Sequence, residues 1–136
     1  MKRLAFIVLL MAFSIAGLAV QATASEGGKA SRISLKDLKT AMANGSVTLL
    51  DCNGAQTFSR YHISGAIHLD ANKDGLAALL PAQKDALIVS YCGNENCPKY
   101  KHGVEAAAKL GYTNIKYFEP GISGWMDAGE AVASSK

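Results

Sequence analysis

Apolar residues gather into short continuous runs along the chain, separated by polar, turn-forming residues. The runs at residues 47–51 (VTLLD) and 86–91 (ALIVSY) do not alternate with polar positions. Continuous runs of this length are typical of strands that are buried on both faces of a parallel sheet. The runs at 65–69 (GAIHL) and 114–118 (NIKYF) predict two further strands.

Helix signals lie between these predicted strands. Ser34, three residues before Asp37, is typical of an N-terminal cap, and the helix that follows is expected to end at Asn44-Gly45. Pro98 is a favourable first residue for another helix, which Gly111 ends. Because strands and helices alternate, the sequence predicts an α/β fold with a mostly parallel sheet and helices on both faces. Short helices are also expected at residues 56–60, at 76–80 and after Gly121.

The first residues of the chain resemble a secretory signal peptide. Lys2 and Arg3 precede the largely apolar residues 4–20, and a small-residue segment follows. We expect cleavage before Ser25, which makes residues 1–24 the signal peptide and the mature protein periplasmic or secreted, with no membrane association. The alternative is an uncleaved anchor, because the apolar segment reaches the lower length limit of a membrane span.

Charge excludes one class of partner. Lysine and arginine number 14 against 11 aspartate and glutamate, and the leader contributes two of the basic residues. The mature chain therefore has no strong basic field, and its scattered lysines form no cluster that would follow phosphates. We expect no nucleic-acid partner.

The cysteines carry the candidate chemistry. Their number is three, so a pure disulfide framework is excluded and at least one thiol is left over. Cys92 directly follows the predicted strand 86–91, at the end of a parallel strand where α/β proteins place their sites. The backbone N–H groups of residues 93–97 and the positive end of the next helix favour a thiolate there. Cys92 is therefore the predicted nucleophile.

Four motifs, in order, resemble the landmarks of a single-domain rhodanese, a member of the sulfurtransferase family. They are the strand-ending Asp51, the turn 62–66 (HISGA), Cys92 at the head of a six-residue loop, and the late motif 121–125 (GISGW). The resemblance covers residues 33–130 and implies a rhodanese-like domain with a sheet of about five strands. Residues 25–32 are then a flexible lead-in and residues 131–136 a C-terminal tail.

The resemblance implies a covalent relay without a cofactor. Cys92 would take sulfane sulfur from thiosulfate, a persulfide or a polysulfide, and would pass it from a persulfide to cyanide, a thiol or a protein thiol partner. The implied active-site loop consists of Cys92, Gly93, Asn94, Glu95, Asn96 and Cys97.

The chain departs from the family pattern in its charges. Cys97 stands where many rhodaneses have an arginine, Pro98 where a small hydroxyl residue is common, and Asn53 at a commonly basic position. Glu95 adds a negative charge to the loop. These departures make the dianion thiosulfate a poorer donor than a persulfide, a polysulfide or a protein thiol.

The other two cysteines have several interpretations. Three interpretations of Cys97 remain open: a resolving thiol for Cys92, a redox latch or a residue that only fills the loop. A disulfide with Cys92 requires the two Cα atoms to lie within about 7 Å of each other, and a loop wrapped around sulfur tends to hold them further apart. Cys52 follows Asp51 on a strand, so its side chain points to the opposite face and is expected to pack under a helix.

Charged and aromatic residues near the loop have supporting interpretations. Asp51 and His62 are expected to brace loops rather than exchange protons. Lys99 and Lys101 attract an anionic donor or, alternatively, belong to a solvated helix face. Trp125 is expected to anchor the last helix by packing.

Three alternatives to the sulfur relay remain. A metal site from Cys92, Cys97 and His102 is disfavoured because the cysteines are too far apart in sequence for a usual zinc site, and no metal is expected. A thiol–disulfide redox protein would cycle Cys92 with Cys97. A non-catalytic sulfur-carrier or binding module would show negligible turnover with small donors.

Overall fold

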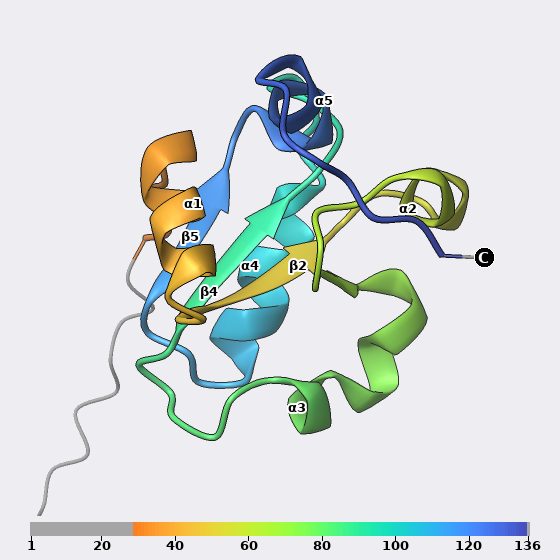
Figure 1. The fold of residues 1–136 in the computed structure, drawn as a ribbon. Helices are drawn as coiled ribbons and strands as arrows, with labels where there is room; N and C mark the ends of the chain where they lie inside the picture. Colours follow the sequence, from red (N-terminus) through yellow and green to blue (C-terminus); the bar gives the residue numbers. More distant parts are fainter. Residues whose placement is uncertain (1–28, 136) are drawn as a thin grey trace, which may run out of the picture.

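The computed structural model describes residues 29–135, which form one parallel sheet with helices on both faces (Figure 1). The strand order is β1-β5-β4-β2-β3, and every strand pair is parallel. The predicted α/β fold, with a mostly parallel sheet of about five strands, is confirmed. The strands are β1 (Ser31–Arg32), β2 (Val47–Asp51), β3 (Ile67–His68), β4 (Leu87–Tyr91) and β5 (Ile115–Phe118).

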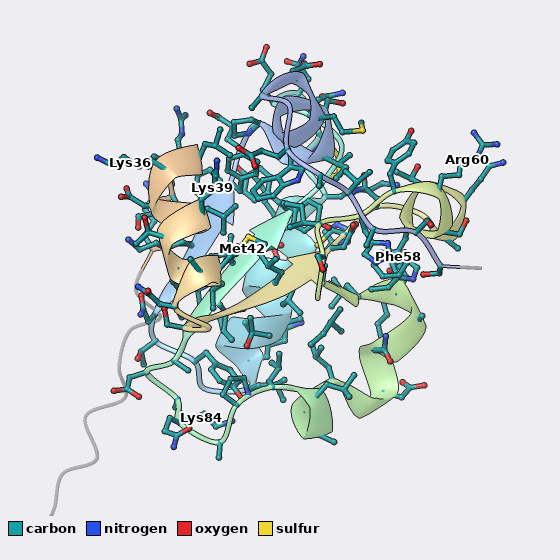
Figure 2. The ribbon with its side chains drawn as sticks, viewed as in Figure 1. Lys36, Lys39, Met42, Phe58, Arg60 and Lys84 are labelled. Atoms are coloured by element: carbon teal, nitrogen blue, oxygen red, sulfur yellow. A yellow bond between two sulfur atoms is a disulfide. The ribbon has the colours of Figure 1, made fainter. Side chains whose placement is uncertain are left out.

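Helix α1 (Leu35–Ala43) begins and ends at the predicted residues. The hydroxyl of Ser34 accepts a hydrogen bond from the backbone N–H of Asp37 at 3.0 Å, which satisfies one of the free N–H groups of the first turn. Figure 2 shows Met42 on the side of α1 that faces the sheet and Lys36 on the side that faces away. The helix is thus capped by its sequence and held by its apolar face.

Two core clusters, one on each face of the sheet, result from the alternation of side chains along the strands. Leu49 and Val89 point to the face covered by α1 and α5 (Gly121–Asp127). Their neighbours Leu50 and Ile88 point to the face covered by α3 (Leu76–Leu79) and α4 (Tyr100–Lys109). Figure 1 shows α1 in front of the sheet and α4 behind it.

Three elements differ from the sequence prediction. Ser31–Arg32, assigned to the flexible lead-in, pairs with Lys116 and Tyr117 of β5, and so short a strand carries no readable alternation. Helix α4 begins at Tyr100 rather than Pro98, because the chain first forms a turn in which the N–H of Lys101 donates to the Pro98 carbonyl. A 3-10 helix at Asp70–Gly75, which was not predicted, precedes α3. The short helix expected at residues 56–60 is α2 (Ala55–Arg60).

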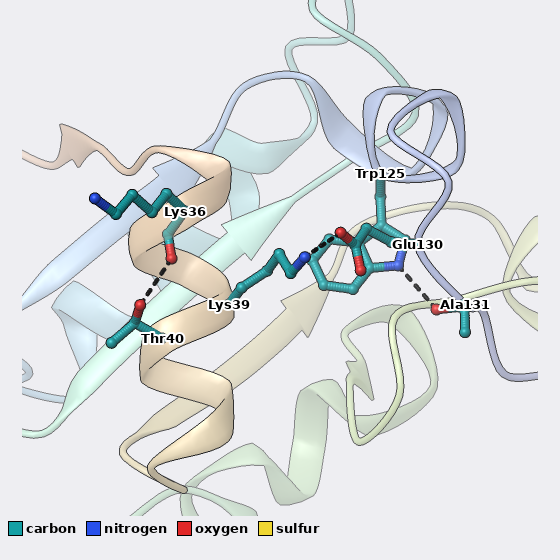
Figure 3. Close-up of polar contacts among 6 residues, drawn as sticks. All are labelled: Lys36, Lys39, Thr40, Trp125, Glu130 and Ala131. Carbon is teal, nitrogen blue, oxygen red and sulfur yellow. Dashed lines mark hydrogen bonds and ion pairs between the residues drawn. The ribbon is translucent and has the colours of Figure 1, made fainter.

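The C-terminal segment, assigned to a tail, packs on the domain. His62 and Ala133 exchange two backbone hydrogen bonds of 2.9 and 2.8 Å, beside α2 (Figure 1). The indole N–H of Trp125 donates to the Ala131 carbonyl at 2.9 Å, and Lys39 of α1 forms an ion pair with Glu130 (Figure 3). These contacts connect the end of the chain to α1, α2 and α5.

The expected signal peptide, residues 1–24, lies outside the described residues. Within residues 29–135, the helices are all too short or too polar to cross a bilayer.

Candidate active site

Cys92 lies at the carboxyl end of β4, the central strand of the sheet. The residue is only 3% exposed. Helix α5 holds the stem of the loop, because the N–H of Ile122 donates to the Cys92 carbonyl and the N–H of Ser123 to the Gly93 carbonyl, both at 2.9 Å. The free N–H groups at the start of α5 thus find their partners in the loop.

Cys92 and Cys97 form a disulfide across the ends of the loop. Their Cα atoms are 6.1 Å apart, within the range that a disulfide allows, so the loop does not hold the two cysteines too far apart. Cys97 is half-buried, whereas Cys92 is covered. In this form neither sulfur is free to act as a nucleophile.

The loop amides are arranged differently from the expected cradle around sulfur. The N–H of Asn96 donates to the side-chain oxygen of Asn94 at 2.9 Å, and the N–H of Cys97 donates to the Asn94 carbonyl at 3.0 Å. Two of the amides expected to face the sulfur therefore fold the loop into a turn that runs from Asn94 to Cys97. In the disulfide form they are not available to stabilise a thiolate.

Asn53 is the polar side chain that approaches the Cys92 sulfur, with its Oδ1 3.9 Å from Sγ. Its orientation is fixed because its Nδ2 and its backbone N–H both donate to Oδ1 of Asp51, at 2.8 and 2.7 Å. The ring of His68 bonds the Asn53 carbonyl through Nε2 at 2.8 Å. The contacts with Asp51 and His68 thus hold the Asn53 side-chain oxygen toward the Cys92 sulfur.

Asp51 is fully buried, and its carboxylate accepts hydrogen bonds from Asn53 and from Tyr91. Its Oδ2 accepts from the hydroxyl of Tyr91 at 2.6 Å, and the same hydroxyl accepts from the N–H of Ile63 at 3.0 Å. Burial, followed by the charge of Asp51, raises the pKa of Tyr91 well above its usual value. Asp51 therefore connects the end of β2 with β4 and with the turn at Ile63.

His62 contacts α2 rather than the sulfur. Its Nδ1 lies 2.7 Å from the Phe58 carbonyl, and its ring stacks on that of Phe58 with centroids 4.0 Å apart (Figure 2 labels Phe58). Trp125 is buried and packs edge-on against Phe118. These contacts are those of bracing and packing residues.

Cys52 packs under α4, on the side of the sheet opposite to Asp51. Its Sγ lies 3.2 Å from the Ser90 hydroxyl, which itself donates to the Tyr100 carbonyl at 2.7 Å. Burial raises the pKa of the Cys52 thiol. A Cβ on Gly103 would lie 2.2 Å from the Ser90 hydroxyl, so only glycine allows α4 this close.

A cavity of about 430 Å³ lies beside the loop and carries negative charge. Lys99 and Lys101 are not among its lining residues. Lys101 instead lines a separate cavity with Tyr100 and Tyr117, because the late start of α4 carries it past the loop. The lining consists of Asn94, Glu95, Asn96, Pro120, Ser123, Gly124 and Asp127.

A family model for the rhodanese-like domain matches residues 34–128, most of the chain. The chain belongs to the rhodanese-like family. None of the curated proteins matches it.

Solved structures share the rhodanese-like fold at low sequence identity. A protein from Lactobacillus plantarum has a TM-score of 0.62 at 20% identity, over 76% of this chain and 87% of the other. A rhodanese-related protein from Thermoplasma volcanium has a TM-score of 0.57 at 20% identity, over 76% and 97%. Thiosulfate sulfurtransferase from Pseudomonas aeruginosa has a TM-score of 0.63 at 20% identity, over 80% of this chain but only 20% of that longer one.

From the sequence, Asn53 is noted only as a departure from a commonly basic position, and Tyr91 is not predicted to belong to this rhodanese-like site. Asn53 stands two residues after Asp51 and forms the side-chain turn typical of asparagine and aspartate, which is a readable local signal. Tyr91 reaches Asp51 from 40 residues away, and no local pattern reports such a contact. In the part of the domain that the structure describes, no three histidine, cysteine or acidic residues gather as a metal site, and His102 lines a cavity with Lys73 and Glu105.

Proposed function

We propose that the protein is a rhodanese-type sulfurtransferase that carries sulfane sulfur as a persulfide on Cys92. The proposal rests on one observation: within a rhodanese-like domain, Cys92 directly follows the central strand β4 and begins the loop that helix α5 holds in place. Parallel α/β sheets place their reactive groups at this end of the strands.

The reaction begins once the Cys92–Cys97 bond is reduced. The Cys92 thiolate attacks the outer sulfur of a donor persulfide, and the remainder of the donor leaves as a thiolate. With thiosulfate the same attack expels sulfite. The terminal sulfur then passes to an acceptor, and Cys92 is regenerated as a thiolate.

Charge near the loop favours some donors over others. Glu95 and Asp127 line the cavity beside the tip of the loop, and both would repel a dianion such as thiosulfate. We therefore expect a persulfide, on a small molecule or on the cysteine of a protein partner, or a polysulfide to be preferred as donor, with a thiol or cyanide as acceptor. No metal or other cofactor takes part. We further propose that the protein works after export, in the periplasm or outside the cell.

The test compares the reduced protein with three cysteine variants. After reduction and removal of the reductant, Cys97→Ser is treated with thiosulfate and, separately, with a low-molecular-weight persulfide, and the modified cysteine is mapped by mass spectrometry. We expect the gain of one sulfur at Cys92, more readily from the persulfide. Cys92→Ser should gain none, whereas the buried-thiol control Cys52→Ala should behave as wild type. Sulfur transfer that persists in Cys92→Ser would refute the mechanism.

The disulfide itself favours a second candidate function, a thiol–disulfide redox protein. In that case donor treatment of the reduced protein would bring a loss of two hydrogens and no sulfur on Cys92 in Cys97→Ser. A non-catalytic sulfur-binding module would instead retain sulfur on Cys92 and fail to pass it to cyanide or thiols.

A further inference from the structure

Cys97 is the feature of the loop that a simple sulfur relay leaves unused. The turn from Asn94 to Cys97 is held by bonds of 2.9 and 3.0 Å, and it directs the far end of the loop back toward the near end. The result is a direct bond between the sulfurs of Cys92 and Cys97. Helix α5 fixes the Cys92 end of the loop through the bonds of Ile122 and Ser123, and the turn positions the Cys97 end.

The sulfur that Cys97 reaches is the one that would carry the persulfide. In a persulfide, the inner sulfur is Cys92 Sγ and the outer sulfur is the transferred atom. The structure joins Cys97 Sγ to Cys92 Sγ, which is the product of attack on the inner sulfur. Attack on the outer sulfur would move the persulfide to Cys97 and would leave no such bond.

We propose that Cys97 resolves the Cys92 persulfide, so that the protein releases its sulfur as hydrogen sulfide and is left as the disulfide. This inference rests on the proposed sulfurtransferase function. The Cys97 thiolate attacks Cys92 Sγ, the bond from Sγ to the terminal sulfur breaks, and that sulfur leaves with the electron pair as hydrosulfide. The sulfane sulfur is reduced to sulfide, and the two cysteine thiols are oxidised to a disulfide.

A dithiol reductant completes the cycle. Cys97 is half-buried whereas Cys92 is 3% exposed, so the first thiolate of the reductant attacks the sulfur of Cys97 and displaces Cys92 as a thiolate. The second thiol of the reductant then attacks the mixed disulfide, which frees Cys97 and leaves the reductant as a cyclic disulfide. The net reaction converts a sulfane donor and a dithiol into sulfide, the spent donor and a disulfide.

The exposure of the two sulfurs also sets the order of events. Cys92 is regenerated in its covered position at the end of β4, while the reductant stays attached to the more exposed Cys97. The activity is therefore a dithiol-dependent release of sulfide, with Cys92 as the acceptor of sulfur and Cys97 as the resolving thiol.

The test is a single-turnover measurement without reductant. Reduced wild type and Cys97→Ser, each freed of reductant, receive one equivalent of a low-molecular-weight persulfide, and sulfide and intact mass are followed. We expect wild type to release about one sulfide per chain and to finish as the disulfide. Cys97→Ser should hold the extra sulfur and release sulfide at least about tenfold more slowly, because it lacks an attacking thiol held beside the persulfide.

Two controls distinguish the possible failures. Cys52→Ala should match wild type, and the extra sulfur on Cys92 of Cys97→Ser, seen by intact mass together with an unchanged circular-dichroism spectrum, shows that this variant is folded and loaded. If wild type and Cys97→Ser both keep the persulfide and release no sulfide, the resolving role is wrong and the sulfurtransferase proposal stands. If neither protein gains sulfur on Cys92, both proposals fail. With dithiothreitol and an excess of the persulfide present, wild type should release many equivalents of sulfide per chain. Release of only one equivalent would contradict the cycle.

Discussion

The hydroxyl of Tyr91 joins three segments of the chain at one buried point. It donates to Asp51 at the end of β2 and accepts from the N–H of Ile63, and the same carboxylate also holds Asn53 beside the sulfur. A buried group of this kind is costly to leave without partners. Single atoms here therefore determine the position of the Cys92 loop.

Replacing Tyr91 with phenylalanine tests this network. Tyr91→Phe leaves the Ile63 N–H and one oxygen of Asp51 without a partner, and we expect a loss of about 1–3 kcal/mol in the free energy of unfolding. Urea denaturation at neutral pH measures it. An unchanged midpoint would show that the hydroxyl contributes nothing.

The same variant should change the response to alkaline pH. The pKa of Tyr91 is raised in the folded protein, so above about pH 10 the unfolded chain loses this proton while the folded one keeps it. Wild-type stability must then fall as the pH rises through that range. Because the other tyrosines are common to both proteins, Tyr91→Phe should show a shallower fall, and parallel curves would contradict the assignment.

Residue roles differ in how far the sequence predicts them. Cys92 is readable because a strand signal ends directly before it, and the capping pair Ser34 and Asp37 is readable because its partners are three residues apart. The contact of Tyr91 with Asp51 spans 40 residues and depends on β2 and β4 being neighbours in the sheet. The disulfide depends on the turn at Asn94, which a spacing of cysteines does not reveal.

At the scale of elements, the start of α5 presses directly on the Cys92 loop. Gly121 has a φ of +63°, and a Cβ there would lie 2.6 Å from the Cys92 carbonyl oxygen and 2.7 Å from the Gly93 carbonyl carbon. Both are backbone atoms, so they cannot rotate away. The position needs glycine for its conformation and for the close approach.

Gly121→Ala should therefore impair sulfur loading as well as stability. We expect displacement of the loop stem and a marked loss of persulfide formation on Cys92, measured by intact mass after donor treatment. Gly129 is a matched control, because its φ is +78° and nothing lies within 4 Å of a Cβ there. Gly129→Ala should lose about 1 kcal/mol of stability from the strained backbone alone and keep its activity. Equal effects of the two substitutions would show that contact with the loop is unimportant.

The disulfide closes a short ring, and this limits its effect on stability. Cys92 and Cys97 are five residues apart, so chain entropy attributes about 2 kcal/mol to the bond. We expect reduction to lower the urea midpoint modestly and to leave the fold intact, as judged by denaturation with and without dithiothreitol. Unfolding on reduction would be incompatible with a cycle that opens the bond at each turnover.

Elements with a strong internal pattern could be predicted, and those without one could not. Strands β2, β4 and β5 and helix α1 carry long apolar runs or helical spacing, and each lies at or within a residue of its predicted place. Strand β1 has only two residues and owes its pairing to β5. Helix α4 begins late because the loop ahead of it ends in a turn rather than in a helical first residue.

For the whole molecule, the predicted export determines whether the two loop cysteines rest as thiols or as a disulfide. A thiol pair in an oxidising compartment rests as a disulfide unless a reductant opens it. Expression of the full chain in a Gram-negative host, followed by fractionation and mass measurement, should give a periplasmic protein that starts at Ser25 and carries the Cys92–Cys97 bond. A membrane-bound chain of full mass would support an uncleaved anchor instead.

The parallel α/β arrangement of the whole domain could be predicted, but the order of its strands could not. Alternation of strands and helices restricts the sheet to parallel pairings, whereas the order β1-β5-β4-β2-β3 depends on which crossings bury both core clusters. The packing of Ala133 on His62 was also not predicted, because residues 131–136 have no pattern of their own.

The two hydrogen bonds from α5 to the carbonyls of Cys92 and Gly93 divide the loop into a fixed base and a variable tip. Glu95 and Asn96 lie in the tip, exposed to solvent and apart from both cores. Evolution or design can therefore substitute these two side chains without changing the base of the loop. New charge at the tip would change which sulfur compounds the protein admits, while the nucleophile stays where the scaffold has fixed it.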